Sequence, residues 1–124
     1  MKIVESSGAP KPIGPYSQAI VEGGFVFVAG MVGLDPASGK MVEGGVREQT
    51  ARALASLMSV LEKAGSSPKK VTKTTVYIKD GALFKDMNEV YAGFFGEHRP
   101  ARTTVVTGFP RDDILVEIDA IAGT

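Results

Sequence analysis

Two segments of the chain repeat apolar residues at helical spacing. Residues 46–64 place apolar or threonine side chains three or four positions apart, and Gly65 follows them. Residues 83–95 show the same spacing in phenylalanine, methionine and tyrosine, and Gly96 follows. Since an amphipathic helix buries one such face and commonly ends at glycine, we expect two helices that pack on a shared core.

Short runs rich in β-branched and aromatic residues predict five strands, at residues 18–22, 25–29, 71–79, 103–107 and 114–121. Gly23 and Gly24 join the first two runs, a typical hairpin turn. We read the last two runs as a second hairpin in which residue 106 faces residue 117. Both pairs would then be antiparallel.

The predicted order, β-β-α-β-α-β-β, favours an α+β fold in a single domain, residues 1–124. Its sheet is mixed or largely antiparallel, and the two helices cover one face. No third helix is available for the other face. That face is therefore expected to pack against further copies of the chain.

The composition of the chain argues against several classes of function. Fourteen basic and fourteen acidic residues cancel, and no basic block could neutralise a row of phosphates, which argues against nucleic acid as a partner. No apolar run approaches the length of a membrane span, so we expect a soluble, cytoplasmic protein. The chain has no cysteine and only one histidine, His98, which excludes thiolate chemistry and multi-histidine metal sites. We expect no metal.

Two carboxylates interrupt the apolar run at residues 114–121. Glu117 and Asp119 are two positions apart, so their side chains point to the same face of a strand. A partly buried carboxylate there could hold a water or a proton. The alternative is an edge strand with a solvated face.

Arg102 stands at the start of an apolar β run, and its planar fork can bind a carboxylate through two hydrogen bonds. In the predicted hairpin it lies on the same face as Glu117, roughly 13 Å away, a gap that suits a small ligand and a water. The alternative is a surface arginine. Tyr16 ends a stiff loop rich in proline and could simply pack beneath it, and we assign His98 no catalytic role.

Six segments, in order and spacing, resemble the RidA/YjgF family of reactive-intermediate deaminases: IGPYSQAI (13–20), FVFVAG (25–30), KTTVYIKD (73–80), MNEVYAGFF (87–95), RPARTTV (99–105) and ILVEIDAIA (114–122). The resemblance implies a chorismate-mutase-like fold in a homotrimer, with a central barrel and ligand clefts between subunits. It also implies hydrolysis of 2-iminopropanoate and 2-iminobutanoate to 2-keto acids and ammonia without a cofactor.

The same resemblance implies residue roles. Arg102 corresponds to the arginine that binds the substrate carboxylate, and Glu117 to the acid that orients the attacking water. Tyr16 lines the cleft, Gly30 brings its backbone to the substrate, and the main chain of Thr104 contacts ligand or water.

The chain departs from the family's usual residues at Ala29, Met31, Thr104 and Asp119, where serine, glutamine, cysteine and glutamate are common. These changes put one substrate hydrogen bond in doubt and make a pocket wall more apolar. Two alternatives therefore stay open beside the deaminase: a non-catalytic module that binds small metabolites such as keto acids, and an endoribonuclease or translation inhibitor.

Overall fold

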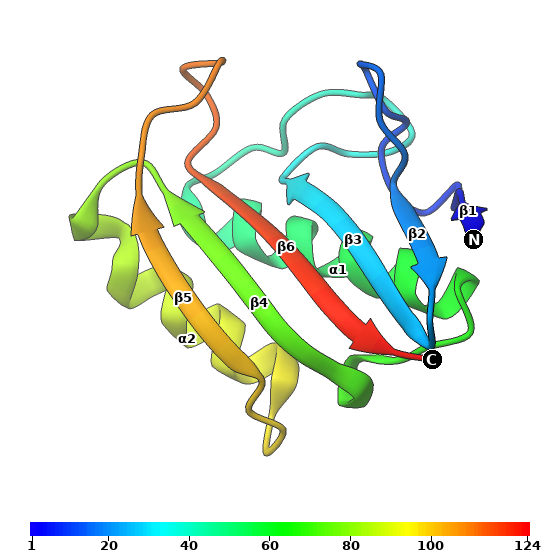
Figure 1. Cartoon of the computed structure of the whole chain (residues 1–124). Helices are drawn as coiled ribbons and strands as arrows, with labels where there is room; N and C mark the ends of the chain where they lie inside the picture. Colours follow the sequence, from blue (N-terminus) through cyan, green and yellow to red (C-terminus); the bar gives the residue numbers. More distant parts are fainter.

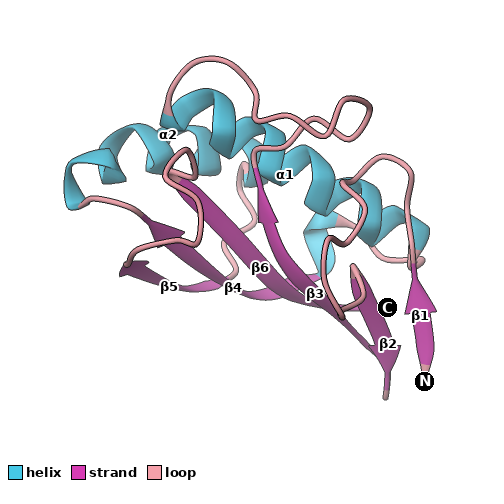
Figure 2. Ribbon diagram, turned by 90° about the horizontal axis from the view of Figure 1, so that it is seen from above, coloured by secondary structure: helices cyan, strands magenta, loops and turns pink.

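The computed structural model describes all 124 residues as one six-stranded sheet with both helices on one face. Figure 2 shows this two-layer arrangement edge-on. The helices are α1 (Val46–Lys63) and α2 (Phe84–Phe95). The strands are β1 (Lys2–Val4), β2 (Ala19–Glu22), β3 (Phe25–Val32), β4 (Val71–Ile78), β5 (Ala101–Val106) and β6 (Val116–Gly123). Two short 3-10 turns, η1 (Pro68–Lys70) and η2 (Gly81–Leu83), precede β4 and α2.

The strand order is β1-β2-β3-β6-β4-β5 (Figure 1), with β4 and β5 parallel and every other pair antiparallel. The mixed sheet, the two helices on one face and the first hairpin were predicted and are confirmed. Two details differ. The three-residue β1 was not predicted, and β3 continues to Val32 through a bulge between Val28 and Met31.

The predicted hairpin of the last two strands is wrong. β5 pairs only with β4, and β6 lies between β3 and β4. Residue 117 faces Tyr77 and Val32, and residue 106 faces Ile78. The long connection at residues 107–115 lets β6 cross past β4. Burial explains why β6 takes the central place. Every residue of β6 is buried or half-buried, so this strand removes the most apolar surface from water when it has a neighbour on both sides.

The core lies between the sheet and α1. Val116, Ile118, Ala120 and Ala122 of β6 are at most 2% exposed, and they belong to the same cluster as the buried leucines of α1 at positions 54, 57 and 61. Intervening residues of β6 therefore point away from the helices. Glu117 and Asp119 share that helix-free face, as the two-residue spacing predicts.

The helix-free face keeps large apolar side chains in the open. Phe25 and Phe27 of β3 are 45% and 43% exposed, and Val105 of β5 is 37% exposed. Their register places them in rows with Ile121 of β6 and Tyr77 of β4. Nothing within the chain covers this face, so its burial against further copies stays a prediction.

Gln18, 2% exposed, holds the proline-rich loop that precedes Tyr16. Its side-chain carbonyl accepts a hydrogen bond from the Ser6 amide at 2.6 Å, and its Nε2 donates to the carbonyls of Ser6 and Pro10 at 3.1 and 2.9 Å. These bonds satisfy backbone groups that would otherwise be buried without partners. The loop is thereby fixed against β2.

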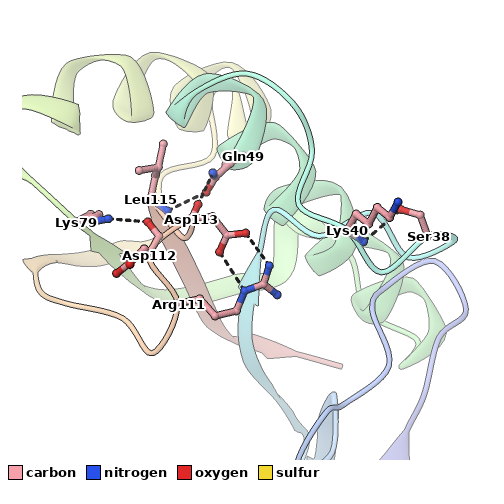
Figure 3. A network of polar contacts seen from close by, with 8 residues as sticks. All are labelled: Ser38, Lys40, Gln49, Lys79, Arg111, Asp112, Asp113 and Leu115. Carbon is pink, nitrogen blue, oxygen red and sulfur yellow. Dashed lines mark hydrogen bonds and ion pairs between the residues drawn. The ribbon is translucent and has the colours of Figure 1, made fainter.

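Gln49 of α1 does the same for the connection between β5 and β6 (Figure 3). Its Nε2 donates to the Asp113 carbonyl at 2.8 Å, and its Oε1 accepts from the Leu115 amide at 2.9 Å. At the same end of the loop Lys79 donates to the Asp112 carbonyl, and Arg111 pairs with Asp113. The strand that carries Glu117 therefore enters the sheet from a fixed point.

No helix in the structure combines the length and apolar character that crossing a membrane requires.

Gly33 is packed closely against Gln49 of α1, so a substitution at this position tests how tightly the end of β3 packs on the helix. A Cβ at residue 33 would lie 2.8 Å from the Gln49 Cα, a backbone atom that cannot yield easily. We expect Gly33→Ala to lower the free energy of unfolding by about 1 to 3 kcal/mol, measured by urea denaturation. Gly93→Ala is the matched control: it adds the same methyl group in α2 with no atom within 4 Å, and should stabilise by about 0.5 to 1 kcal/mol. Equal effects at the two positions would contradict the close packing at Gly33.

Candidate functional site

Arg102 extends from β5 toward α2. In the parallel register it is the neighbour of Thr74, which is fully buried and hydrogen-bonded through its hydroxyl to the Tyr91 hydroxyl at 2.7 Å. The Arg102 guanidinium carbon lies 4.7 Å from the Tyr91 ring centroid, and Nη1 donates to Asn88 Oδ1 at 2.7 Å. Stacking and one hydrogen bond therefore fix the orientation of the guanidinium and leave its other donors free.

No acidic side chain pairs with Arg102. The ion pairs of the chain join Met1 to Glu22, Arg47 to Asp86 and Glu89, and Arg111 to Asp113. The guanidinium borders a cavity of about 350 Å³, here called the Arg102 hollow, lined by Asn88, Tyr91, Ala92, Phe95, Gly96, His98, Arg99, Pro100 and Arg102. A half-buried cation with free donors beside a cavity is suited to bind an anionic ligand.

Glu117 lies against Gly30 on the helix-free face. A Cβ at residue 30 would lie 2.5 Å from Glu117 Oε2, so only glycine allows the carboxyl group its place. Burial raises the pKa of the Glu117 carboxyl, and the nearby charge of Asp119 raises it further. No hydrogen bond of the chain engages this carboxyl group. It is thus free to accept one from a water, with a pKa shifted toward the range useful for proton transfer.

Tyr16 and Gly30 border one smaller cavity of about 70 Å³, here called the Tyr16 cavity, together with Pro10, Lys11, Ile13, Gln18, Met31, Val32 and Leu34. Tyr16 is 52% exposed at its mouth, so the loop covers only about half of its side chain. Met31 is buried and makes one wall of this cavity apolar. Gly30 therefore borders both the Tyr16 cavity and the Glu117 carboxyl group.

Arg102 and Glu117 are not on one face, which corrects the sequence prediction. Arg102 neighbours Thr74 on the helix side, whereas Glu117 neighbours Tyr77 on the helix-free side. Their Cα atoms are two strands and three residues apart, which corresponds to roughly 14 Å in a sheet of standard geometry. The error follows from the wrong hairpin. Direct pairing of β5 with β6 would place residues 102 and 117 on the same face, whereas the observed register, with β4 between the two strands, places them on opposite faces. Thr104, two residues after Arg102, shares the face of Arg102.

Asp119 differs from Glu117 in being engaged. Its carboxylate accepts hydrogen bonds from the Tyr77 hydroxyl and the Thr75 amide, each at 3.2 Å, and its charge raises the pKa of Tyr77. His98 donates through Nε2 to the Val71 carbonyl at 2.6 Å, which ties the end of α2 to β4. The hydrogen bonds of Asp119 join β6 to β4, and that of His98 joins the segment after α2 to β4. No three His, Cys, Asp or Glu side chains gather closely enough to hold a metal ion.

Asn88 was missed by sequence reasoning. It is a polar residue on the apolar stripe of α2, four positions after Phe84 and three before Tyr91, both of which contact Arg102. Its place in that stripe was the available signal, because a polar side chain on a core-facing helix surface needs a partner. The partner is Arg102, and it comes from a strand that sequence spacing could not place.

The molecule is thus an α+β protein with a cationic site at a sheet edge and an acidic site on the open sheet face. Residues 6–124 match the family described as Endoribonuclease L-PSP. The chain belongs to this family, the RidA/YjgF family, and the resemblance noted from its motifs is confirmed.

Relatives match almost end to end. A RutC family protein of Pyrococcus abyssi is 48% identical over 98% of this chain and 95% of its own length. A mouse protein named 2-iminobutanoate/2-iminopropanoate deaminase is 43% identical over 98% of this chain and 90% of its own. The crystal structure of Escherichia coli TdcF with bound serine superposes with a TM-score of 0.93 at 36% identity, covering 100% of this chain and 99% of that one. The chorismate-mutase-like α+β fold is confirmed.

The raised pKa of Glu117 predicts how stability depends on pH. A carboxyl group whose pKa is higher in the folded state favours folding at low pH, and that contribution is lost as pH rises through the folded-state pKa. Glu117→Gln should therefore unfold at a higher temperature than the wild type at pH 7, and the gap should close near pH 4. Thermal denaturation at fixed protein concentration measures this.

Asp35→Asn is the control of opposite sign. Hydrogen bonds from Ser38 lower the pKa of Asp35, so its charge favours folding above the unfolded-state pKa and loses that effect as pH falls. The asparagine variant should be less stable than the wild type at pH 7. A Glu117→Gln variant that is less stable at pH 7 would contradict the burial of that carboxyl group.

Proposed function

We propose that this protein hydrolyses small 2-imino acids to 2-keto acids and ammonia. Water adds to the C=N carbon of the protonated imine, the water proton passes to a base, and the resulting carbinolamine breaks its C–N bond to release ammonia and leave the ketone. The net change adds one water and releases one ammonia. Such an imine is already electrophilic, so positioning and charge stabilisation suffice and no cofactor is needed.

The observation that carries the proposal is the unpaired Arg102 guanidinium beside its hollow. Asn88 and the Tyr91 ring hold it from one side, and its remaining N–H donors match the two oxygens of a substrate carboxylate. Arg102 would orient the substrate without taking part in bond making or breaking, and an imine that is already reactive requires no more than this.

Glu117 is proposed as the group that holds the attacking water. Its carboxyl group has no partner within the chain and has a raised pKa, so it can take a proton from water and return it to the departing amine. Gly30 leaves the space in front of it, and Tyr16 lines the adjoining cavity. The main chain of Thr104, on the strand of Arg102, is proposed as a further ligand contact.

Because Arg102 and Glu117 lie on opposite faces of one sheet, a three- or four-carbon substrate cannot touch both within one chain. We propose that the site forms in a homotrimer, in clefts where Arg102 of one subunit meets Glu117, Gly30 and Tyr16 of the next. The open apolar face with Phe25 and Phe27, and the free edge of β5, support this assembly.

Two relatives support the substrate class. The mouse protein carries the name of this deaminase, and TdcF was crystallised with serine, a small molecule with a carboxylate and a nitrogen on the next carbon. The endoribonuclease alternative lacks support from the site, because the one histidine is engaged with the Val71 carbonyl. Ligand binding without hydrolysis would favour the metabolite-binding module instead.

Activity is tested by coupling a threonine dehydratase to the purified protein and following decay of the imine. Arg102→Ala should lower kcat/KM about 100-fold or more, because the carboxylate loses a bidentate partner. Glu117→Gln should lower kcat by about 100- to 10,000-fold with keto-acid binding retained. Arg47→Ala, an exposed arginine paired with Asp86 and Glu89, is the matched control and should match the wild type. Decay at the same rate with and without the protein would exclude the deaminase.

Subunit mixing tests where the site forms. Arg102→Ala and Glu117→Gln proteins, each inactive alone, are unfolded, mixed in equal amounts and refolded. If each site takes its arginine and its acid from different subunits, random assembly makes roughly one site in four fully intact, so about a quarter of wild-type activity should return. The mass in solution should be three times the 13.0 kDa of the chain. No recovery of activity from a properly assembled trimer would place both residues in one subunit's site.

A further inference from the structure

We propose that Arg99 gives the site a second cationic contact, so that its substrates include 2-imino acids with a second carboxylate. The inference rests on the proposed function and deepens it by naming the substrate class. Arg99 and Arg102 both line the Arg102 hollow, and none of the nine lining residues is acidic. A monocarboxylate needs only one of these two arginines.

Arg99 is free to act on a ligand. It takes part in none of the ion pairs and hydrogen bonds of the chain, and it is exposed at the mouth of the hollow. The neighbouring His98, which also lines the hollow, is already bound to the Val71 carbonyl. The positive charge that a ligand meets beyond Arg102 therefore comes from Arg99.

The backbone between the two arginines is short and stiff. Pro100 fixes its own φ and restricts the residue before it to an extended conformation, so Arg99 is held with little freedom in its main chain. Three extended residues span at most about 10 Å. Arg99 precedes the first residue of β5, so strand alternation does not force it to the opposite side, and its side chain lines the same hollow.

This spacing matches a small dicarboxylate. With C–C bonds of about 1.5 Å, the two carboxyl carbons of a four- or five-carbon diacid lie at most about 4 to 5 Å apart. The Arg102 guanidinium is held in place by Asn88 and Tyr91. The exposed Arg99 side chain, whose Cα lies at most about 10 Å from that of Arg102, is long enough to reach the other end of the ligand. Ala92 and Gly96 line the hollow with little side-chain volume and leave room for the longer ligand. The hydrolysis is unchanged: one water enters and one ammonia leaves.

Keto-acid products test this without depending on turnover. Affinities of the full-length protein for 2-oxoglutarate and 2-oxobutanoate are measured by calorimetry at low salt. We expect the wild type to bind 2-oxoglutarate about five- to tenfold more tightly, a modest ratio because Arg99 is exposed and screened by water. Arg99→Gln should bring the ratio of the two affinities to about one. Arg47→Gln, the matched change on α1, should keep the wild-type ratio.

Each outcome decides the matter. A wild type that binds both keto acids equally, or an Arg99→Gln variant that keeps the full preference, would overturn the role of Arg99 and leave the proposed deaminase intact. If neither keto acid binds, the role of Arg99 falls, and the decay of the imine still decides the proposed deaminase separately. A preference that weakens as salt is raised, in the wild type but not in Arg99→Gln, would support a charge contact at Arg99.

Discussion

Everything in this molecule depends on the period-two alternation of β6 at the centre of the sheet. Its even-numbered residues, from Val116 to Ala122, are buried against the helices, and the strand is held between β3 and β4. The same alternation forces Glu117 onto the opposite face, beside Gly30 of β3. A slip of one residue would expose the core and bury the carboxylates, so the packing energy of the core also fixes the place of the acid.

The cationic and acidic sites are built in different ways. Arg102 is held by side chains of α2, through a hydrogen bond to Asn88 and contact with the Tyr91 ring. Glu117 is held by strand register and by the space that Gly30 leaves, with no hydrogen bond of its own. The first arrangement fixes a charge and leaves donors free. The second leaves a carboxyl group partly desolvated, which raises its pKa.

Local patterns were sufficient for the elements. Helical spacing located α1 and α2 to within a residue or two, and the glycine pair located the first hairpin. The pairing of the last strands was not local. Neighbouring segments usually pair, but the connection at residues 107–115 is long enough for β6 to pass β4, and only the summed burial of three strands decides which place it takes. That single error placed Arg102 on the wrong face and hid its contact with Asn88.

The two buried glutamines have a consequence for the thermodynamics of recognition. Gln18 secures the loop that carries Tyr16, and Gln49 secures the loop that leads to Glu117, each through hydrogen bonds to backbone groups. Irregular segments normally lose conformational entropy when a ligand orders them, and that loss weakens binding. Here the ordering has already taken place during folding. A small ligand can therefore be bound by few contacts, since little of their favourable enthalpy is offset by freezing the loops.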